Sequence, residues 1–356
     1  MNLTVGDFLR LTNNFYQSRN VYADINRLQL DLDLSNYLAG NIDKLEKKYK
    51  VALCFICINP TYWEYAKPMV EGAKQFFLPG HNVDYLFWTD MPKPDETENL
   101  EKAKFFLEQV IQGRHAQMNT PQEIIDLEKK ETWERTLTSL KFTYDCIVFP
   151  IEPIEWPMPT LMRYHTFLQQ EEKLREYDYV FYCDVDMLFA NIVGDEILGE
   201  GLTAALHPMY ALDKSMWPPY EPNEKSEAFV PRPGQVIVEN NQPRYMPMYF
   251  AGGLQGGRTK EWIEAMKKMK GMIDKDLING YIAIWNDESH WNKYLLNVKP
   301  AVVLTPSYIY PDSLIKEYYE PRWGRSYPPK LVTITKKHSL KPLSQGDRER
   351  LTKIMK

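Results

Sequence analysis

The sequence predicts an α/β fold with a mainly parallel central sheet. From about Val51 onward, short runs of β-branched and aromatic residues alternate with segments of helical pattern. The first of these segments read as a strand at Val51–Ile58, a helix at Tyr62–Phe77 and a strand at Val83–Thr89. Their short connections fit a parallel β-α-β unit. Of the 356 residues, 44% are apolar, which is enough to bury a full core in one large domain or two smaller ones.

The elements that follow continue the alternation. The segment Glu96–Thr138 is charged, helix-prone and poor in glycine, so it predicts an inserted helical segment on the surface. Further strands are expected at Tyr144–Ile151, Tyr179–Asp186, Leu202–His207, Tyr249–Leu254 and Val302–Tyr310. Further helices are expected at Thr160–Glu176, at Lys260–Lys270 with Gly271 as its stop signal, and at Ile278–Asn297. The segment Pro208–Pro247 holds eight prolines and predicts a long loop, which at such a length is usually functional or disordered.

The two ends of the chain differ from this core. Residues 1–50 are polar and mostly helical in pattern, and they end in the charge cluster Lys44–Lys50. The C-terminal end, from Lys336 onward, is basic. We therefore expect an N-terminal helical extension at 1–50, a main domain at 51–338 with the helical insertion at about 96–138, and a basic tail at 339–356.

Composition and cysteine usage exclude several classes of protein. The net charge of −5 and the pI near 5.8 disfavour a nucleic-acid or anionic-membrane partner. The four cysteines lie in apolar runs, and Cys54 and Cys57 face opposite sides of an extended chain, so buried thiols are expected rather than a redox pair or a zinc site. Met1–Arg10 lacks the pattern of a signal peptide, and no apolar stretch is long enough to span a bilayer. These features predict a cytoplasmic protein.

A pair of acids ends one predicted strand. Asp184 and Asp186 follow Tyr179–Cys183, and residues two apart in an extended chain project to the same side. Parallel sheets bind ligands at the carboxyl ends of their strands, and two carboxylates there can hold a hard divalent cation that bridges a diphosphate. Asp31–Asp33 and Asp274–Asp276 have the same spacing but ordinary solvated surroundings.

Other candidate residues allow a structural as well as a functional interpretation. Asp287 and Glu288 lie among aromatic residues and form either an exposed helix start or part of a site. The cluster Gly252–Gly257 is no dinucleotide fingerprint, but it can mark a close approach of the backbone to a ligand. His207 could be a satisfied histidine at a strand end, and Arg163 could extend its charge from an apolar helix to solvent.

Taken together, these segments resemble glycosyltransferase family 6, the group that contains the blood-group A and B transferases and α1,3-galactosyltransferase. The resemblance covers about Val51 to His338. It rests on an ordered set of segments rather than on one motif. They are Asp184–Phe189, Val193–Leu198, Ala205–Pro208, Tyr220–Pro231, Tyr249–Gly257, Asn279–Leu296 and Lys299–Tyr308.

The resemblance implies a GT-A-type nucleotide-sugar-binding fold and a donor site for a UDP-sugar. By this resemblance Tyr62 stacks on uracil, Arg163 contacts the donor, and Lys336 supplies a second cation. Asp184 and Asp186 would hold Mn²⁺ against the diphosphate. The departing UDP develops negative charge that a bound cation stabilises.

The family also implies transfer with retention of configuration. Glu288 would face the anomeric carbon, as nucleophile or as stabiliser of an oxocarbenium-like state. Asp287 and His207 would bind sugar hydroxyls, and Trp285 would offer an apolar face to the acceptor. The acceptor implied is a galactoside or a fucosylated galactoside, joined in α linkage, as in the α1,3-transferases.

The strand residues Ala251, Gly252 and Gly253 suggest the donor, because this strand faces the C2 and C4 substituents of the sugar in the family. Galactose-specific relatives carry alanine at the place of Gly253, where a methyl group would crowd an N-acetyl group. UDP-GalNAc is therefore favoured over UDP-Gal. The alternatives are a UDP-Gal-dependent transferase, a catalytically inactive lectin-like protein, and a metal-dependent phosphoesterase built on the same acids.

Some features depart from the family pattern. Pro60 lies in the turn before Tyr62, the helical insertion before Thr138 is foreign, and Pro311-Asp312 replaces a simpler acidic position. The membrane anchor and stem of the animal enzymes are not found, which resembles soluble microbial or phage-type members.

Overall fold

The structure is a computed structural model of the chain and describes residues 48–116, 118–212, 218–231, 248–312 and 329–334. The expected tail at 339–356, Lys336 and all but the last three residues of the expected N-terminal extension lie outside these residues. No helix in the described part of the chain is long and apolar enough to cross a membrane.

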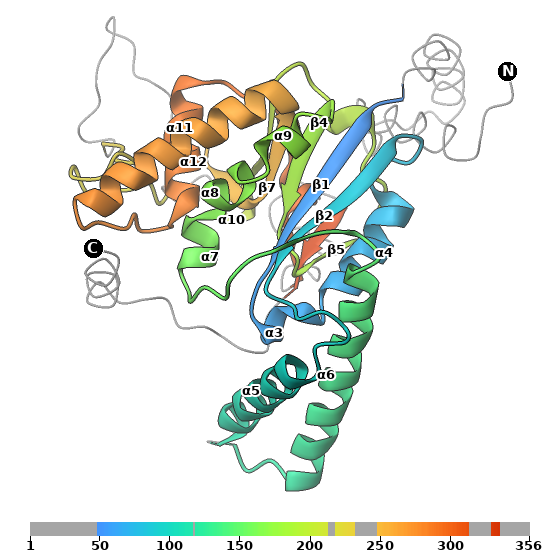
Figure 1. Ribbon diagram of the computed structural model, residues 1–356. Coiled ribbons are helices and arrows are strands. Elements are labelled where there is room, and N and C mark those ends of the chain that lie inside the picture. The colour runs from blue at the N-terminus through green and yellow to red at the C-terminus, as the bar shows by residue number, and fades with distance from the viewer. Residues whose placement is uncertain (1–47, 117, 213–217, 232–247, 313–328, 335–356) are drawn as a thin grey trace, which may run out of the picture.

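A seven-stranded sheet forms the centre of the domain, with the strand order β3-β2-β1-β4-β7-β6-β8. Strand β7 runs antiparallel to β4 and β6, whereas the other neighbouring pairs are parallel. The predicted α/β fold with a mainly parallel sheet is therefore confirmed (Figure 1). The strands are β1 Lys50–Cys57, β2 Asn82–Thr89, β3 Ile147–Pro150, β4 Tyr179–Cys183, β6 Leu202–Leu206, β7 Phe250–Arg258 and β8 Val302–Leu304.

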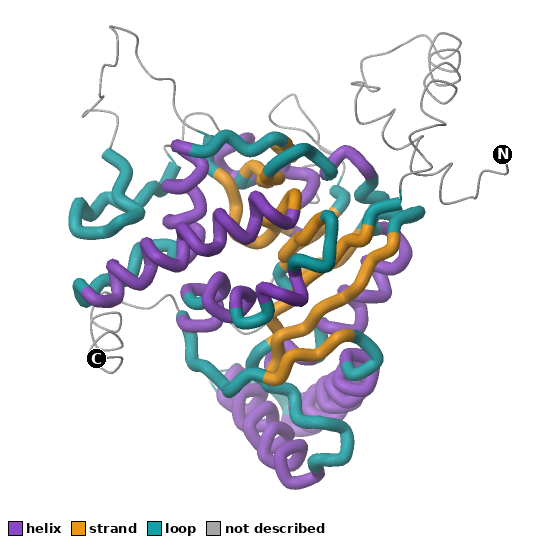
Figure 2. The backbone as a smooth tube through the Cα atoms, turned by 45° about the horizontal axis from the view of Figure 1, so that its top comes forward, coloured by secondary structure: helices purple, strands orange, loops and turns teal. Residues whose placement is uncertain are grey.

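Helices cover both faces of this sheet (Figure 2). One face packs against α4 (Ala66–Phe76), and the other packs against α8 (Arg163–Leu168) and α11 (Thr259–Ile278). Alternation along β1 divides its side chains between the two cores, so Cys54 and Cys57 point to opposite faces as predicted. All four cysteines are free.

The structure contains a second, three-stranded sheet that was not predicted. It pairs β5 (Met187–Phe189) with β10 (Leu331–Thr333), and β10 with β9 (Tyr310–Pro311). The expected strand Val302–Tyr310 is broken because a 3₁₀ turn, η5 (Pro306–Tyr308), separates β8 from β9. Strand β10 brings the C-terminal part of the chain beside the acid pair.

Several predicted helices are divided or shifted. The first is split into α3 (Pro60–Trp63) and α4, because Pro60 begins a short helix that the Asn59 side chain caps. The helix expected at Thr160–Glu176 consists of α7 (Met158–Leu161), α8 and α9 (Glu171–Leu174). The helix expected from Ile278 begins only at Asp287, as α12 (Asp287–Asn297), because α11 continues to Ile278. The loop expected from Pro208 begins with a short helix, α10 (Pro208–Leu212).

The helical insertion is a hairpin of α5 (Thr97–His115) and α6 (Gln122–Thr143) that projects from the domain (Figure 1). The hairpin is not wholly the solvated surface that the sequence suggested, because Thr132 and Thr136 of α6 are buried, and α6 continues past the expected end to the buried Ser139. The Ser139 hydroxyl donates a hydrogen bond to the carbonyl of Glu64 (2.9 Å) and accepts one from the backbone N–H of Lys67 (3.3 Å). The insertion therefore supports the junction between α3 and α4.

Two glycines on neighbouring elements should respond oppositely to alanine. Helix α11 passes through Gly271, where an added Cβ meets nothing within 4 Å. At Gly257 the φ angle is 138° and a Cβ would lie 2.2 Å from the carbonyl oxygen of Gly201. We expect Gly271→Ala to raise the free energy of unfolding by about 0.5–1 kcal/mol, because alanine favours a helix. Gly257→Ala should lower it by more than about 2 kcal/mol.

Urea denaturation followed by circular dichroism measures both changes. A destabilised Gly271→Ala variant would contradict the continuous helix, and an unchanged Gly257→Ala variant would contradict the close approach of β7 to Gly201.

Candidate active site

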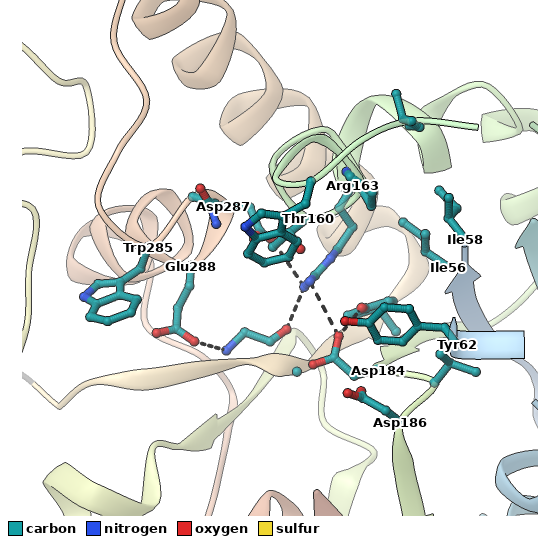
Figure 3. A pocket seen from close by; sticks show the side chains of 18 of the residues that line it. Ile56, Ile58, Tyr62, Thr160, Arg163, Asp184, Asp186, Trp285, Asp287 and Glu288 are labelled. Carbon is teal, nitrogen blue, oxygen red and sulfur yellow. Dashed lines mark hydrogen bonds and ion pairs between the residues drawn. The ribbon is translucent and has the colours of Figure 1, made fainter. Parts of the chain in front are cut away.

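A cavity of about 630 Å³ opens at the carboxyl ends of β1 and β4 (Figure 3). It is bounded by β1, α3, the segment 154–163, the end of β4, β7 and the start of α12. Nine residues that the sequence analysis proposed line this one cavity. They are Tyr62, Arg163, Asp184, Asp186, Gly252, Gly253, Trp285, Asp287 and Glu288.

Arg163 lies at the centre of the polar contacts in this cavity. It begins α8, is 4% exposed, and its guanidinium group lies 3.9 Å from the centre of the Tyr182 ring. Its Nη1 donates to the carbonyl of Gly252 (2.7 Å) and lies 3.1 Å from a carboxylate oxygen of Asp287. Its Nη2 lies 3.6 Å from a carboxylate oxygen of Asp184. Arg163 therefore joins two acids from different elements and does not extend its charge to solvent.

The same contacts determine the charge of Arg163. Burial by itself lowers the pKa of the guanidinium group, but the neighbouring carboxylates, Asp287 foremost, outweigh burial and raise it. The group is thus a permanent buried cation.

Asp184 and Asp186 lie at the end of β4, as predicted, and both face the cavity (Figure 3). The Asp184 backbone N–H donates to the carbonyl of Gly253 (2.9 Å), and the hydroxyl of Tyr182 donates to its carboxylate. The Asp186 carbonyl accepts the N–H of Ile334 (3.1 Å), which follows β10. Two carboxylates at a strand end are a donor set that fits a hard divalent cation. Among the residues described, no group of three or more His, Cys, Asp or Glu side chains could hold a metal ion.

Glu288 is fixed at the start of α12 by two donors. The Tyr249 hydroxyl donates to one carboxylate oxygen (2.8 Å), and the backbone N–H of Gly252 donates to the other (2.6 Å). The amide of Asn292, one turn later, pairs with both backbone groups of Phe250 (2.7 and 2.8 Å) and so binds α12 to β7. Glu288 is therefore held by the strand that also borders Asp184.

The two adjacent acids differ in their surroundings. Burial raises the pKa of Glu288 to about 7, although the hydrogen bonds from Gly252 and Tyr249 act against this rise. Burial raises the pKa of Asp287 to about 6, against the attraction of Arg163. Asp287 is only 1% exposed and ion-pairs with Arg163, whereas Glu288 remains open to the cavity.

The other end of the cavity is apolar and aromatic. Tyr62 of α3 faces it together with Ile56, Ile58 and Trp156. The turn that presents Tyr62 is fixed because both carboxylate oxygens of Asp90 accept the backbone N–H of Asn59 (3.0 Å). Apolar and aromatic walls of this kind suit a planar base.

Two proposed residues do not line the cavity. The Ala251 side chain packs into the core on the α4 face of the sheet. The His207 ring lies against the rings of Tyr210 and Tyr249, with centroids 4.9 and 5.9 Å away, and so stands behind the tyrosine that holds Glu288. Burial lowers the pKa of His207 to about 4, so its ring is neutral at physiological pH. Trp285 lines the cavity and is 45% exposed.

The glycines of β7 let the acids approach the strand. A Cβ on Gly253 would lie 2.6 Å from Oδ2 of Asp184 and 2.9 Å from Cδ1 of Ile309. A Cβ on Gly252 would lie 3.2 Å from Oε2 of Glu288. An alanine at Gly253 would thus displace the Asp184 carboxylate, whatever it did to a bound sugar.

The residues that hold the acids were missed by the sequence analysis. Tyr182 precedes Asp184 by two positions on the same side of β4, and Asn292 follows Glu288 by one helical turn. Both spacings were visible in the sequence. The role of Tyr249 was not, because it contacts Glu288 across 39 positions of the chain.

Comparisons with known proteins give a consistent result. A model of glycosyltransferase family 6 matches residues 148–320. Globoside alpha-1,3-N-acetylgalactosaminyltransferase 1 of Homo sapiens is 29% identical over 253 residues, which cover 70% of this chain and 58% of that protein. The protein of the same name from Gallus gallus is 27% identical over 251 residues, which cover 70% of this chain and 59% of that protein. Histo-blood group ABO system transferase 1 of Rattus norvegicus is 29% identical over 280 residues, which cover 77% of this chain and 66% of that protein. The chain thus spans less than two thirds of the length of these relatives.

The surroundings of Glu288 predict how its carboxyl group titrates. We expect a pKa near 7 in the wild-type protein and a higher pKa in Tyr249→Phe, because the lost hydroxyl no longer stabilises the ionised form. ¹³C NMR of glutamate carboxyl groups, assigned with Glu288→Gln, measures both values.

Tyr220→Phe is the control, because the Tyr220 hydroxyl donates to the carbonyl of Met248 and its ring lies beside Tyr249. An ordinary pKa of Glu288, or an equal shift in both tyrosine variants, would contradict the described hydrogen bonds.

Proposed function

We infer from the match to the model of glycosyltransferase family 6 and from the relatives above that this chain belongs to that family, and that it transfers GalNAc from UDP-GalNAc to a galactoside-type acceptor. Transfer would retain the anomeric configuration, form an α1,3 linkage and depend on Mn²⁺. One observation carries the proposal: the strand-end acids Asp184 and Asp186 and the acid Glu288 face one cavity, and Arg163 lies between them.

The apolar end of the cavity would hold the uracil, with Tyr62 against the base. Asp184 and Asp186 would hold Mn²⁺ against the diphosphate, where the cation supplies charge that stabilises the departing UDP. The buried Arg163 would stay charged and offset the negative charge of an ionised Asp287 at the sugar end. Lys336, which lies outside the described residues, remains a proposed second cation.

Glu288 would act at the anomeric carbon. Its carboxyl group ionises around pH 7, is held by Tyr249 and Gly252, and opens to the cavity. An ionised carboxylate so placed can form a covalent glycosyl intermediate or stabilise positive charge on the sugar. Asp287, which lines the cavity, would contact hydroxyls of the donor sugar. Trp285 would face the acceptor, whereas His207 lies outside the cavity, beside the ring of Tyr249.

The donor sugar is proposed from the relatives and from β7. Two of the relatives described above are N-acetylgalactosaminyltransferases by name. Glycine at 252 and 253 lets Glu288 and Asp184 lie close to β7, and an alanine at either position would press on these acids. Discrimination between two donor sugars that differ by one substituent is modest, roughly 1–3 kcal/mol. UDP-Gal is the second candidate.

The first test is UDP release from UDP-GalNAc with a β-galactoside acceptor. We expect activity with Mn²⁺, none in excess chelator, and a loss on the order of 10²-fold in Asp186→Asn, because a transition-state charge loses its stabiliser. Asp195→Asn is the control, because Asp195 pairs with His81 away from the cavity.

Full activity in chelator would contradict the metal proposal. Release of inorganic phosphate instead of UDP would indicate a phosphoesterase, and binding without any turnover would indicate a lectin-like protein.

The second test is competition between UDP-GalNAc and UDP-Gal at equal concentration. We expect a modest preference for UDP-GalNAc, of at most roughly 100-fold. Because a methyl group on Gly253 meets Asp184, Gly253→Ala should also weaken binding of UDP with Mn²⁺. Preference for UDP-Gal would overturn the donor assignment, and unchanged UDP binding by Gly253→Ala would contradict the contact with Asp184.

A further inference from the structure

A fully buried histidine lies two residues after Glu288. His290 of α12 is 0% exposed, and both of its ring nitrogens contact acceptor atoms. Nδ1 lies 2.9 Å from the backbone carbonyl oxygen of Asn286, and Nε2 lies 2.9 Å from Oδ2 of Asp276 in the last turn of α11.

The protons of these contacts can be assigned from the chemistry of the partners. A carbonyl oxygen only accepts, so Nδ1 of His290 must carry a proton. The carboxylate of Asp276 already accepts the Ser226 hydroxyl (2.6 Å) and the Glu227 N–H (2.7 Å), as an ionised carboxylate does. Nε2 must then carry a proton as well. We propose that His290 is a buried imidazolium paired with Asp276, and that this pair positions the turn carrying Asp287 and Glu288.

His81 shows that a neighbouring carboxylate alone does not imply a doubly protonated ring. Its Nε2 lies 2.9 Å from Asp195, much as that of His290 lies from Asp276. Its Nδ1, however, accepts the backbone N–H of Tyr49 (3.1 Å) and therefore carries no proton. The partner of the second nitrogen distinguishes the two histidines.

Ser226, Asp276 and His290 contain the residue types of a hydrolase triad in a different arrangement. The serine hydroxyl donates to the aspartate and not to the histidine, and all three side chains are buried. The group therefore holds structure in place and does not activate a nucleophile.

The pair of His290 and Asp276 joins α11, the segment 218–231 and the turn that carries Asp287 and Glu288. The Nδ1 proton holds the carbonyl of Asn286, whose φ of 52° begins the turn into α12. Asp276 anchors the segment 218–231 through Ser226 and Glu227. In the same segment, buried Glu221 accepts the N–H of Ile284 (2.6 Å), just before the turn.

The charges around His290 agree with an imidazolium. Asp276 faces it from α11, and Asp287 of α12 attracts it. Tyr281, which precedes α12, donates its hydroxyl to Glu221. The two lysines nearby contact the segment 218–231 itself: Lys275 pairs with Glu227, and Lys293 donates to the carbonyl of Phe229.

¹⁵N NMR of the imidazole nitrogens in the full-length wild-type protein tests the charge directly. At about pH 7.5, both ring nitrogens of His290 should carry a proton. His81 should show one bare nitrogen, Nδ1, under the same conditions. Assignment uses His290→Gln and His81→Gln. One bare nitrogen on His290 would overturn the proposal, since it would mean a neutral ring or a protonated Asp276.

The positioning role is tested by kinetics, which rest on the proposed transfer. A glutamine at 290 can still donate to Asp276 but no longer holds the Asn286 carbonyl. We expect His290→Gln to lower kcat by roughly 10- to 100-fold while UDP affinity stays near that of the wild type. His81→Gln should change neither.

An unchanged kcat in His290→Gln, or a loss of UDP affinity equal to the loss of kcat, would refute the positioning role. If the wild-type protein transfers no sugar at all, the proposed function fails, and the NMR measurement still decides the charge of His290.

Discussion

The site depends on one buried charge. Arg163 is almost fully enclosed, and an enclosed cation is stable only where acids and hydrogen-bond acceptors surround it. Asp287, Asp184 and the Gly252 carbonyl supply them from α12, the end of β4, and β7. Because the guanidinium group contacts Asp184 and Asp287, it fixes the distance between the acids proposed for the metal and those proposed for the sugar.

Strand β7 makes this convergence possible. It runs antiparallel between β4 and β6 and carries glycines where the neighbouring side chains approach most closely. Its backbone N–H at Gly252 holds Glu288, and its carbonyl at Gly253 holds the N–H of Asp184. The insertion α5–α6 acts on the opposite wall, because Ser139 holds the junction next to the helix of Tyr62. Both walls of the cavity are thus held by hydrogen bonds in which main-chain groups take part.

Local patterns in the sequence predicted much of the fold and most of the cavity. Alternation identified the core strands, and the position of Asp184 and Asp186 after a buried strand placed them at the sheet edge. The prediction missed the short strands β5 and β10, because each contains only three residues and is stabilised by pairing with distant segments. Arg163 remained ambiguous because its partners lie 21 to 124 positions away. The pKa of Glu288 depends in the same way on Tyr249, which lies 39 positions away, and no local pattern encodes that contact.

A double-mutant cycle on Arg163 and Asp287 tests the central claim most directly. The free energy of unfolding is measured by urea denaturation for the wild type, Arg163→Met, Asp287→Asn and the double variant. Each single change leaves a buried charge without its partner, so we predict a coupling of about 2–3 kcal/mol between the two sites. Additive effects of the two substitutions would contradict the claim that this ion pair holds the site together.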